Sequence, residues 1–307
     1  MLVISASVFP VRAINYTYFY SPDTISNISG RAYADSDCPT NWLNMSLFGA
    51  TGNGVSQTIS NWNLGDFTYL VSPSPVGSYQ RGISNGDYGS TSVQMTSDAV
   101  GAELHTWSIP GGSGYNYNLL NGQVKYKWDY TDNKRPWAHS NSVFKFSFNL
   151  KVNNSYMIGG SCGYVYASIL IEDPNGKYFS IQPQIYDTRY VPNSEYVGWD
   201  AGMNAGYANS YYRYDNNGVA RYCTKNPASY SSTNSTWTDW HWYGFSIDRT
   251  QLLNAINDVN NTYGAGLSTD PSEWRLLLIT IQDEIYWPTG NGHLSFAAKD
   301  LWAYEEY

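Results

Sequence analysis

Two acidic residues stand between an apolar run and two aromatic residues near the carboxyl end of the chain. In residues 274–287, an unbroken apolar stretch leads into Gln282, Asp283 and Glu284, and an aromatic pair follows. A carboxyl group held among aromatic side chains and out of water has a raised pKa, which suits it to donate a proton. The alternative is that both carboxylates are solvated charges at a strand end, which is the usual place of Asp and Glu.

The elements that must position these acids are predicted from sequence patterns. Residues 276–279 are all apolar, which indicates a strand covered on both faces. Residues 274–287 and 293–304 flank a turn with two glycines, and this predicts a terminal β-hairpin. Further runs with strand character lie between turn residues, at 41–48, 66–71, 92–95, 102–109, 123–130, 142–152, 163–172, 177–186 and 240–247.

Many short strands with frequent turns predict an all-β fold, an antiparallel β-sandwich of the jelly-roll, concanavalin-like type. Residues 143–152 alternate apolar and polar side chains, as a half-buried strand does. The turn Asp-Pro-Asn-Gly at 173–176 joins two runs into a hairpin. One short helix is predicted between Asp248, where Gln251 has capping-box spacing, and Gly264, and we expect it to pack on the outside of a sheet.

The length and composition predict a single sandwich domain over residues 14–307, with a long loop insertion near 190–236. Charged residues make up 14% of the chain and aromatic residues 17%, with 29 Tyr and 12 Trp, so neutral side chains supply most of the polarity. The net charge is −8, and no basic run is longer than Lys134-Arg135. Because nothing here attracts phosphates, we expect no nucleic acid partner.

The amino-terminal segment indicates an extracellular protein. Residues 1–13 are largely apolar and end in a small residue, which favours a signal-peptide remnant over the alternative, an N-terminal β-strand. Glycosylation sequons begin at Asn15, Asn27, Asn44, Asn153, Asn234 and Asn260. No later stretch is apolar for 18 residues, so we expect no membrane-spanning segment. These features predict a secreted or cell-surface glycoprotein.

The cysteines and histidines follow no metal-ligand spacing. Cys38, Cys162 and Cys223 are far apart, so either two of them form a disulfide or they are small buried residues. The four histidines are isolated, and the chain has no phosphate-binding glycine loop. We expect neither a metal nor a cofactor.

The abundance of Trp and Tyr in a neutral sandwich favours a sugar-binding cleft, because flat rings stack on the apolar faces of pyranoses. The alternative is that the rings pair across strands in the core. Candidate platforms are Trp42, Trp62, Trp107, Trp128, Trp137, Trp199 and Trp287. Glycoside hydrolysis needs two carboxyl groups, roughly 5 Å apart for retention or roughly 6.5–9.5 Å apart for inversion. The strand-borne carboxylates are Glu103, Glu172, Asp173, Asp283 and Glu284.

The order of these segments resembles glycoside hydrolase family 12, a family of jelly-roll endoglucanases, and especially its archaeal members. Residues 39–44 resemble the early region of the family in which a Trp stacks on substrate, and residues 127–137 resemble its strand that ends in a Lys-Pro-Trp loop. Residues 282–287 fall where the family has Phe-Gly-Thr-Glu-Pro-Phe, so the resemblance implies that Glu284 is the acid/base. It also implies a set of substrate-binding aromatic residues: Trp42, Trp128, Trp137, Tyr286 and Trp287.

The chain departs from this family at the nucleophile, a Glu that opens a strand of the type Glu-x-Met-Ile-Trp. The matching position here is Tyr166, Phe179 or Ser180, and none of them is a carboxylate. Glu172, at the end of the first candidate strand, is then the partner expected for Glu284. Without a nucleophilic carboxylate the covalent route is closed.

Three functions follow from these patterns. The first is an endo-hydrolase of β-1,4-glucans such as cellulose or hemicellulose, with a polysaccharide as its partner. The second is a non-catalytic polysaccharide-binding or adhesion protein of the same fold. The third is a structural surface or filament glycoprotein that self-associates when an N-terminal strand, residues 2–14, completes a neighbour's sheet.

Overall fold

The computed structural model describes residues 14–20, 27–34, 43–45, 77–82, 89–95, 100–106, 119–127, 134–157, 162–188, 195–200, 204–211, 221–226, 240–286 and 292–307. Its strands are β1 (Tyr16–Tyr20), β2 (Asn27–Ala34), β3 (Leu43–Met45), β4 (Gly77–Gly82), β5 (Gly89–Met95), β6 (Val100–Thr106), β7 (Leu119–Lys127), β8 (Val143–Met157), β9 (Cys162–Glu172), β10 (Tyr178–Asp187), β11 (Tyr196–Asp200), β12 (Ala205–Tyr211), β13 (Thr224–Asn226), β14 (His241–Asp248), β15 (Arg275–Tyr286) and β16 (Gly292–Glu306). The helices are α1 (Arg249–Tyr263) and the single 3-10 turn η4 (Pro271–Glu273).

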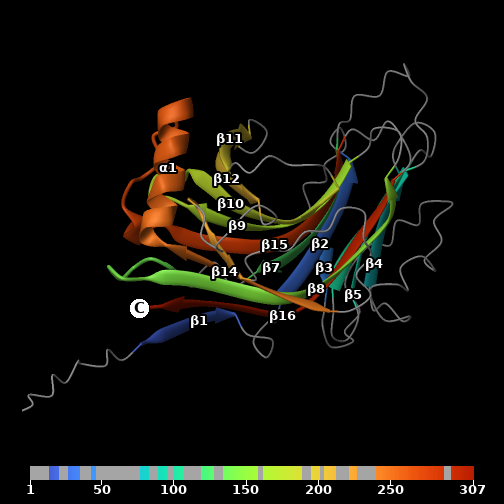
Figure 1. The fold of residues 1–307 in the computed structure, drawn as a ribbon, viewed down its shortest axis with the longest axis horizontal. Coiled ribbons are helices and arrows are strands. Elements are labelled where there is room, and N and C mark those ends of the chain that lie inside the picture. The colour runs from blue at the N-terminus through green and yellow to red at the C-terminus, as the bar shows by residue number, and fades with distance from the viewer. Residues whose placement is uncertain are drawn as a thin grey trace, which may run out of the picture.

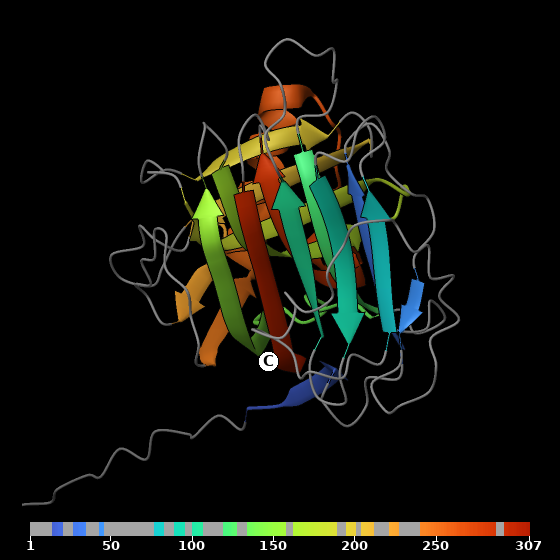
Figure 2. The ribbon, with the colours of Figure 1, turned by 90° about the vertical axis from the view of Figure 1, so that its right-hand side faces the viewer.

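The strands form two stacked sheets, which confirms the predicted β-sandwich (Figure 1). Sheet A has the order β13-β14-β8-β16-β6-β5-β4, with β1 also paired to β16. Figure 2 faces the strands of this sheet from β8 (green) through β16 (red) to β4 (cyan). Sheet B has the order β11-β12-β10-β9-β15-β7-β2-β3. Most pairs are antiparallel, but β10 and β12 run parallel, so sheet B is mixed.

The space between the sheets is filled by side chains that alternate along each strand. Strand β8 turns Phe144, Phe146 and Phe148 inward, and all three are buried. Phe146 stacks on Phe245 of β14 with ring centroids 4.7 Å apart. Each such side chain contributes roughly 1.5–3 kcal/mol by leaving water. The alternation predicted for residues 143–152 is therefore what closes the sandwich.

The terminal pair of strands corrects one prediction. Strands β15 and β16 do not form a hairpin, because β15 lies between β7 and β9 in sheet B and β16 lies between β6 and β8 in sheet A. Both edges of each strand are already hydrogen-bonded to other strands, so none remains for the other member of the pair. The chain between them passes from one sheet to the other.

Helix α1 matches its predicted bounds. The Asp248 side chain accepts from the backbone N–H of Gln251 and the Gln251 side chain accepts from that of Asp248, so the capping box is complete. Gly264 ends the helix in the left-handed conformation at φ 64°, which favours glycine. The buried side of the helix contacts β11, β12 and β14, and Figure 1 shows it at one end of the sheets. Within the described residues, no helix is long and apolar enough to span a membrane.

The turn at 173–176 also forms as predicted and joins β9 to β10. Oδ1 of Asp173 accepts from the backbone N–H groups of Asn175 and Lys177, both at 2.9 Å, and Gly176 adopts a positive φ of 76°. The segment 190–236, predicted as a loop insertion, carries strands β11, β12 and β13. Its short strands were hidden because their polar and Tyr-rich sequence lacks a clear alternation. Cys162 and Cys223 are buried, and Cys38 lies outside the described residues.

Candidate functional site

Sheet B has one apolar face and one polar face. The apolar face is turned toward sheet A and carries residues such as Ile169, Ile181 and Ile281, all fully buried. Residues directly opposite each other in neighbouring strands share a face, so the strand register defines the members of the other side. We call it the polar face of sheet B, made of Tyr164, Tyr166, Ser168, Ser180, Gln184, Asp187, Tyr207, Asn209, Thr280, Gln282 and Glu284.

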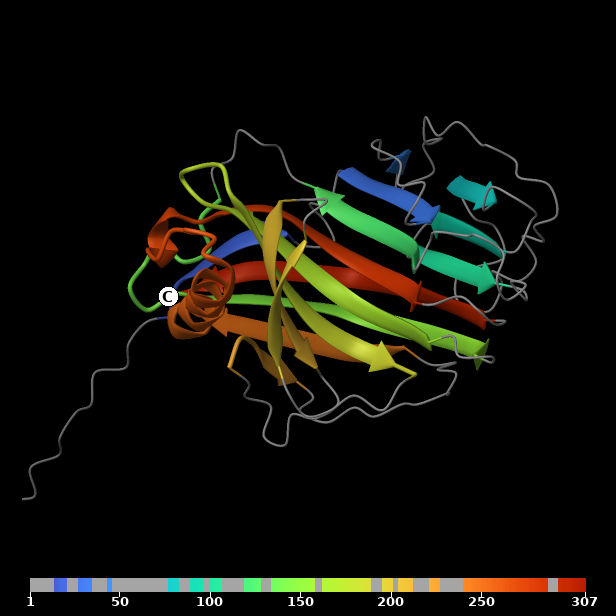
Figure 3. The same ribbon diagram turned by 90° about the horizontal axis from the view of Figure 1, so that it is seen from above.

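The polar face lies on the concave side of the molecule. Strands β9, β10 and β15 bend along their length, so the backbone of sheet B is concave on the side turned away from sheet A (Figure 1). Figure 3 looks down on this surface, where the three strands run side by side in the middle of sheet B. A concave sheet surface lined by hydroxyl, amide and carboxyl groups is suited to hold an extended polar ligand.

Glu284 lies on this face, on β15, at the level of Tyr164 of β9. The side chain is 7% exposed, and its Oε1 accepts a hydrogen bond of 2.5 Å from the hydroxyl of Tyr166 on β9. A carboxyl group this far from water requires such a partner. The neighbouring Asp283 is fully buried and points to the opposite face, toward sheet A, because adjacent strand residues alternate. Of the two predicted acids, Glu284 alone belongs to the polar face.

A second carboxyl group, Asp187 on β10, lies at the same level of the sheet. The register aligns Asp187 with Tyr164 of β9, and Tyr164 with Glu284 of β15. The two acids are therefore separated by two inter-strand spacings, about 10 Å between Cα atoms. Tyr164 occupies the strand position between them, and its ring packs against that of Tyr166 with centroids 5.9 Å apart.

Sequence reasoning missed Asp187 because a β-bulge changes which way it points. Simple alternation would put Gln184 and Asp187, three residues apart, on opposite faces. The register shifts between Gln184 and Tyr186, so both side chains reach the polar face, and Nε2 of Gln184 donates to Oδ2 of Asp187. The sequence shows only an acid at the end of a strand, which is a weak signal.

The expected partnership of Glu172 with Glu284 is wrong. Glu172 pairs with Arg275 at the start of β15, whereas Glu284 pairs with Tyr164. The eight residues between these levels correspond to about 27 Å along the strands. Glu172 instead forms an ion pair with the guanidinium of Arg275. Its position at one end of the sheet excludes a role opposite Glu284.

The predicted aromatic platforms divide into four groups. Trp199 of β11 is partly buried and packs against the core. Trp137 is fully buried, donates from its indole N–H to the carbonyl of Ile247 at 2.8 Å and packs on Phe144, so it belongs to the core and corrects the expectation of a sugar platform. Trp42, Trp128 and Trp287 lie outside the described residues, as do Trp62 and Trp107. Tyr286 is the last residue of β15, and the structure describes its place in the strand but not its side chain.

Tyr207 on β12 adds a hydroxyl donor to the polar face. Burial raises the pKa of Tyr207 to about 12, and Tyr196, Tyr263, Asp200 and Glu284 add to the shift in that order. The hydroxyl therefore stays protonated at neutral pH and can donate to an oxygen of a ligand. The register places Tyr207 opposite Ser180 of β10, at the level of Leu278 of β15, so it lies further along the face than Glu284.

The arrangement can move protons across a bound group. Two carboxyls on one concave surface, with a tyrosine at the strand position between them, can give a proton on one side of a ligand and take one on the other. Cationic or metal chemistry is not needed for such a transfer.

Comparison with known proteins gives structural neighbours only. No protein-family model matches the sequence, and no curated protein matches it. The chain is similar to the xyloglucanase domain of NopAA from Sinorhizobium fredii, solved with cellobiose, at 12% identity and a TM-score of 0.36 over 75% of this chain and 96% of that one. It is similar to the family 11 xylanase of Neocallimastix patriciarum at 8% identity and a TM-score of 0.36 over 76% and 98% of the two chains. A family 12 xyloglucanase from Bacillus licheniformis gives 8% identity and a TM-score of 0.37 over 74% and 98%.

Proposed function

We propose that the protein hydrolyses a polysaccharide, a β-1,4-linked glucan or hemicellulose, on the polar face of sheet B. The observation that carries this proposal is the pair Glu284 and Asp187, which share one concave face at the same level of the sheet. Both are almost out of water, at 7% and 5% exposure. Because buried carboxyls weaken a fold, a pair of them on a ligand-facing surface favours a chemical role.

The spacing favours hydrolysis with inversion. Two strand spacings separate the acids by about 10 Å at Cα, and carboxyl groups roughly 6.5–9.5 Å apart would leave room for a water molecule. Glu284 would protonate the leaving oxygen, and Asp187 would take a proton from the attacking water. The half-buried Tyr164 occupies the strand position between them, where a pyranose can stack on its ring.

Tyr166 and Gln184 act in this proposal as positioning residues. The hydroxyl of Tyr166 holds one oxygen of Glu284, and the amide of Gln184 holds one oxygen of Asp187. In one alignment with glycoside hydrolase family 12, Tyr166 stands where that family has its nucleophilic Glu. The lack of a carboxylate at this position agrees with a direct attack by water on the sugar.

The test is release of reducing sugar from soluble β-glucans by the purified protein and by Glu284→Gln. We expect the substitution to lower kcat about 100-fold or more, because general acid catalysis contributes roughly 10²–10⁴-fold. Glu172→Gln is the matched control, since it removes a strand-borne carboxyl at the far end of the same sheet, and we expect its activity to stay within a few-fold. The anomer released first, read by NMR, should be inverted; a retained anomer would refute the assignment of Asp187 as a base for water.

A second candidate function is polysaccharide binding without catalysis. The low exposure of both acids and their hydrogen bonds to neutral donors favour it, since such groups also hold sugar hydroxyls. Retention of the protein in an affinity gel that contains a β-glucan, with no reducing sugar released from any glucan, would establish this function instead.

The N-terminal strand bears on the filament hypothesis. Residues 1–13 lie outside the described residues. Strand β1 begins directly after them and pairs with the chain's own β16, where Tyr18 lies opposite Tyr304. The described part of the amino-terminal segment is therefore used within the molecule. Self-association through residues 2–14 remains a proposal, and sedimentation of the chain with and without residues 1–13 tests it.

We propose an extracellular location on the basis of the signal-like start and the sequons. One sequon, Asn260, has a structural role: Nδ2 donates to the carbonyl of Leu267 at 3.0 Å, and Oδ1 accepts from its N–H at 2.8 Å. A glycan on this nitrogen would break the first of these bonds, so we expect Asn260 to be unmodified. Detection of the protein in the culture medium, and peptide mass mapping, test both statements.

A further inference from the structure

A second aromatic surface lies on the opposite side of the molecule from the polar face of sheet B. On the outer face of sheet A, turned away from sheet B, large aromatic side chains from three strands stand in solvent. We call them the outer aromatic patch, made of Tyr16 and Tyr18 of β1, Trp302 and Tyr304 of β16, and Trp242 of β14. Tyr16, Tyr18, Trp242 and Trp302 are between 38% and 58% exposed. Nothing in the proposed reaction uses them.

The rings of β1 and β16 hold one another in place. Tyr18 packs against Tyr304 and Trp302 with centroids 5.7 and 6.2 Å apart, and Tyr16 packs against Tyr304 at 5.9 Å. Neighbouring rings restrict rotation of each side chain, so a ligand that stacks here loses little side-chain entropy on binding. The cluster is therefore preorganised for stacking.

Trp242 extends this surface across the sheet. Its indole lies over Gly244, since a Cβ added to Gly244 would be only 2.4 Å from Cη2 of Trp242. The register runs from Gly244 through Ser147 of β8 to Trp302 of β16, so two inter-strand spacings, about 10 Å, separate Trp302 from the backbone position that the Trp242 indole covers. Ser147 occupies the strand position between them. This spacing is comparable to the length of a disaccharide unit.

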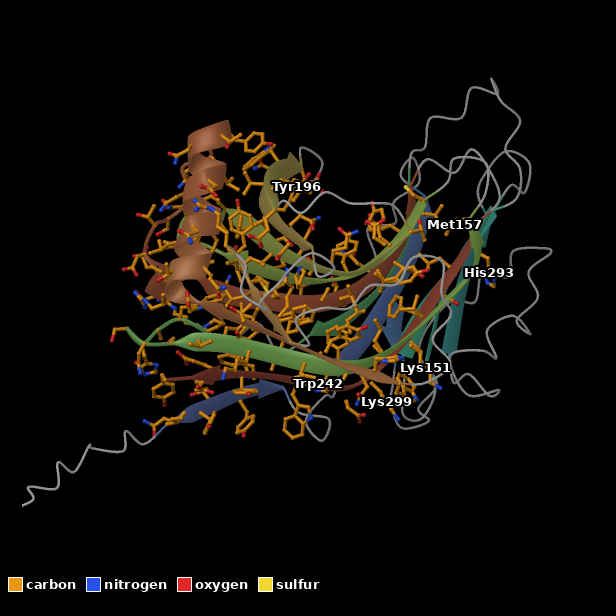
Figure 4. The ribbon with its side chains drawn as sticks, viewed as in Figure 1. Lys151, Met157, Tyr196, Trp242, His293 and Lys299 are labelled. Carbon is orange, nitrogen blue, oxygen red and sulfur yellow. The ribbon has the colours of Figure 1, made fainter. Side chains whose placement is uncertain are left out.

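The charged groups around the patch already interact with other side chains of the protein. Nζ of Lys145 lies 2.6 Å from Oε2 of Glu306, and Nδ2 of Asn149 donates to Asp300 at 2.8 Å. The ammonium groups of Lys151 and Lys299 lie over the ring of Trp240, at 4.9 and 4.6 Å from its centroid. Figure 4 shows Trp242, Lys151 and Lys299 together on this side of the molecule. A ligand for the surface is therefore expected to be neutral.

The composition also argues against a protein partner. The cores of protein interfaces are enriched in aromatic residues, as this patch is, but they are also depleted in Lys, Glu, Asp and Ser. Here Ser147 and the pair Lys145–Glu306 lie among the aromatic rings. Neutral rings with hydroxyl, amide and paired charged groups between them match a sugar chain, which offers an apolar ring face and equatorial hydroxyls.

We propose that the outer aromatic patch is a second binding surface for a neutral β-linked glucan chain, which stacks across Trp302 and Trp242. It would hold a polymer on the side of the sandwich away from the polar face and raise the local concentration of substrate. The ligand class rests on the proposed function, but the site itself shares no residue with it.

Affinity electrophoresis in gels that contain hydroxyethyl cellulose or xyloglucan tests this proposal. The parent protein carries Glu284→Gln to stop hydrolysis, and Trp242→Ala and Trp302→Ala are added singly and together. We expect the double variant to bind about tenfold more weakly, the effect of losing stacking on two rings. Tyr263→Ala, which removes an exposed ring from α1, is the matched control and should migrate like the parent. The thermal unfolding midpoint verifies folding, and the single variants serve if the double variant does not fold.

Hydrolysis of cellotetraose by the same Trp variants with Glu284 intact separates the two sites. Unchanged activity on this short substrate, with weaker retention in the polymer gel, supports the patch. If the native protein hydrolyses nothing but the Trp variants still lose retention, the patch stands and the proposed function falls. The proposed binding surface is refuted if the Trp variants are retained as strongly as the parent, or if neither gel retains the parent. A dimer in sedimentation that the Trp substitutions abolish, without glucan retention, would show a contact between copies and also overturn it.

Discussion

Replacing Tyr166 with phenylalanine removes the hydroxyl that donates to Oε1 of Glu284 at 2.5 Å. Both side chains are more than nine-tenths buried, so water does not replace the lost bond. A hydrogen bond to a charged group contributes roughly 1.5–3 kcal/mol, and one between neutral groups roughly 0.5–1.5 kcal/mol. We expect Tyr166→Phe to lower the free energy of unfolding by about 1.5–3 kcal/mol at pH 7. In the Glu284→Gln background, the same change should cost only about 0.5–1.5 kcal/mol.

Urea unfolding followed by tryptophan fluorescence measures all four proteins of this double-mutant cycle, provided that the slope m stays constant. The predicted coupling energy is about 1–2 kcal/mol, the difference between the two costs. Tyr178→Phe is the control, because Tyr178 is exposed, and its unfolding free energy should change by less than about 0.5 kcal/mol. Additive effects of the two substitutions within about 0.5 kcal/mol would show that Tyr166 does not hold Glu284 and would refute the geometry of the site.

Three further outcomes test other parts of the structure. Trp137→Ala should cost about 3–5 kcal/mol of stability in urea unfolding, because the indole is a core side chain; a change below about 1 kcal/mol would return it to the surface. Asp258→Asn, a substitution on α1, breaks the ion pair with Arg221 and should cost about 0.5–1 kcal/mol at pH 7. Arg221 lowers the pKa of Asp258 below 3.8, so this difference should vanish as the pH falls through that lowered pKa; a difference that persists would contradict the pair. The pKa of Tyr207 is raised from 10.0 to about 12, so the folded protein binds this proton more tightly than the unfolded chain does. The free energy of unfolding should therefore fall as the pH rises from about 10 to about 12, and it should fall less in Tyr207→Phe.

The features that sequence predicted correctly are those encoded by neighbouring residues. The capping box at Asp248 and Gly264 fix both ends of α1 within the helix itself. The hairpin at 173–176 depends on its own turn residues. The alternation of apolar and polar residues in β8 indicates which side chains face the core. The sandwich followed because such strands have to bury one face against a second sheet.

The features that sequence missed depend on partners distant in the chain. Strands β15 and β16 are joined by a short connection, but no local pattern says that they belong to different sheets. Glu172 was paired with Glu284 on residue type, whereas the register sets them far apart. The role of Asp187 depends on a bulge, a single extra residue that alternation does not reveal. The pairing of β1 with β16 joins segments nearly 290 residues apart in the sequence and brings Tyr16 and Tyr18 into the outer aromatic patch.

The central claim is that Asp187 and Glu284 act together across the polar face of sheet B. Its most direct test is the kcat of Asp187→Asn on a soluble β-glucan, measured beside Glu172→Gln and the unmodified protein, with equal unfolding midpoints. We predict that Asp187→Asn lowers kcat by about 100-fold or more while the protein stays bound to the glucan in an affinity gel, and that Glu172→Gln changes it little. Full activity of Asp187→Asn, or an equal loss in Glu172→Gln, would contradict the account.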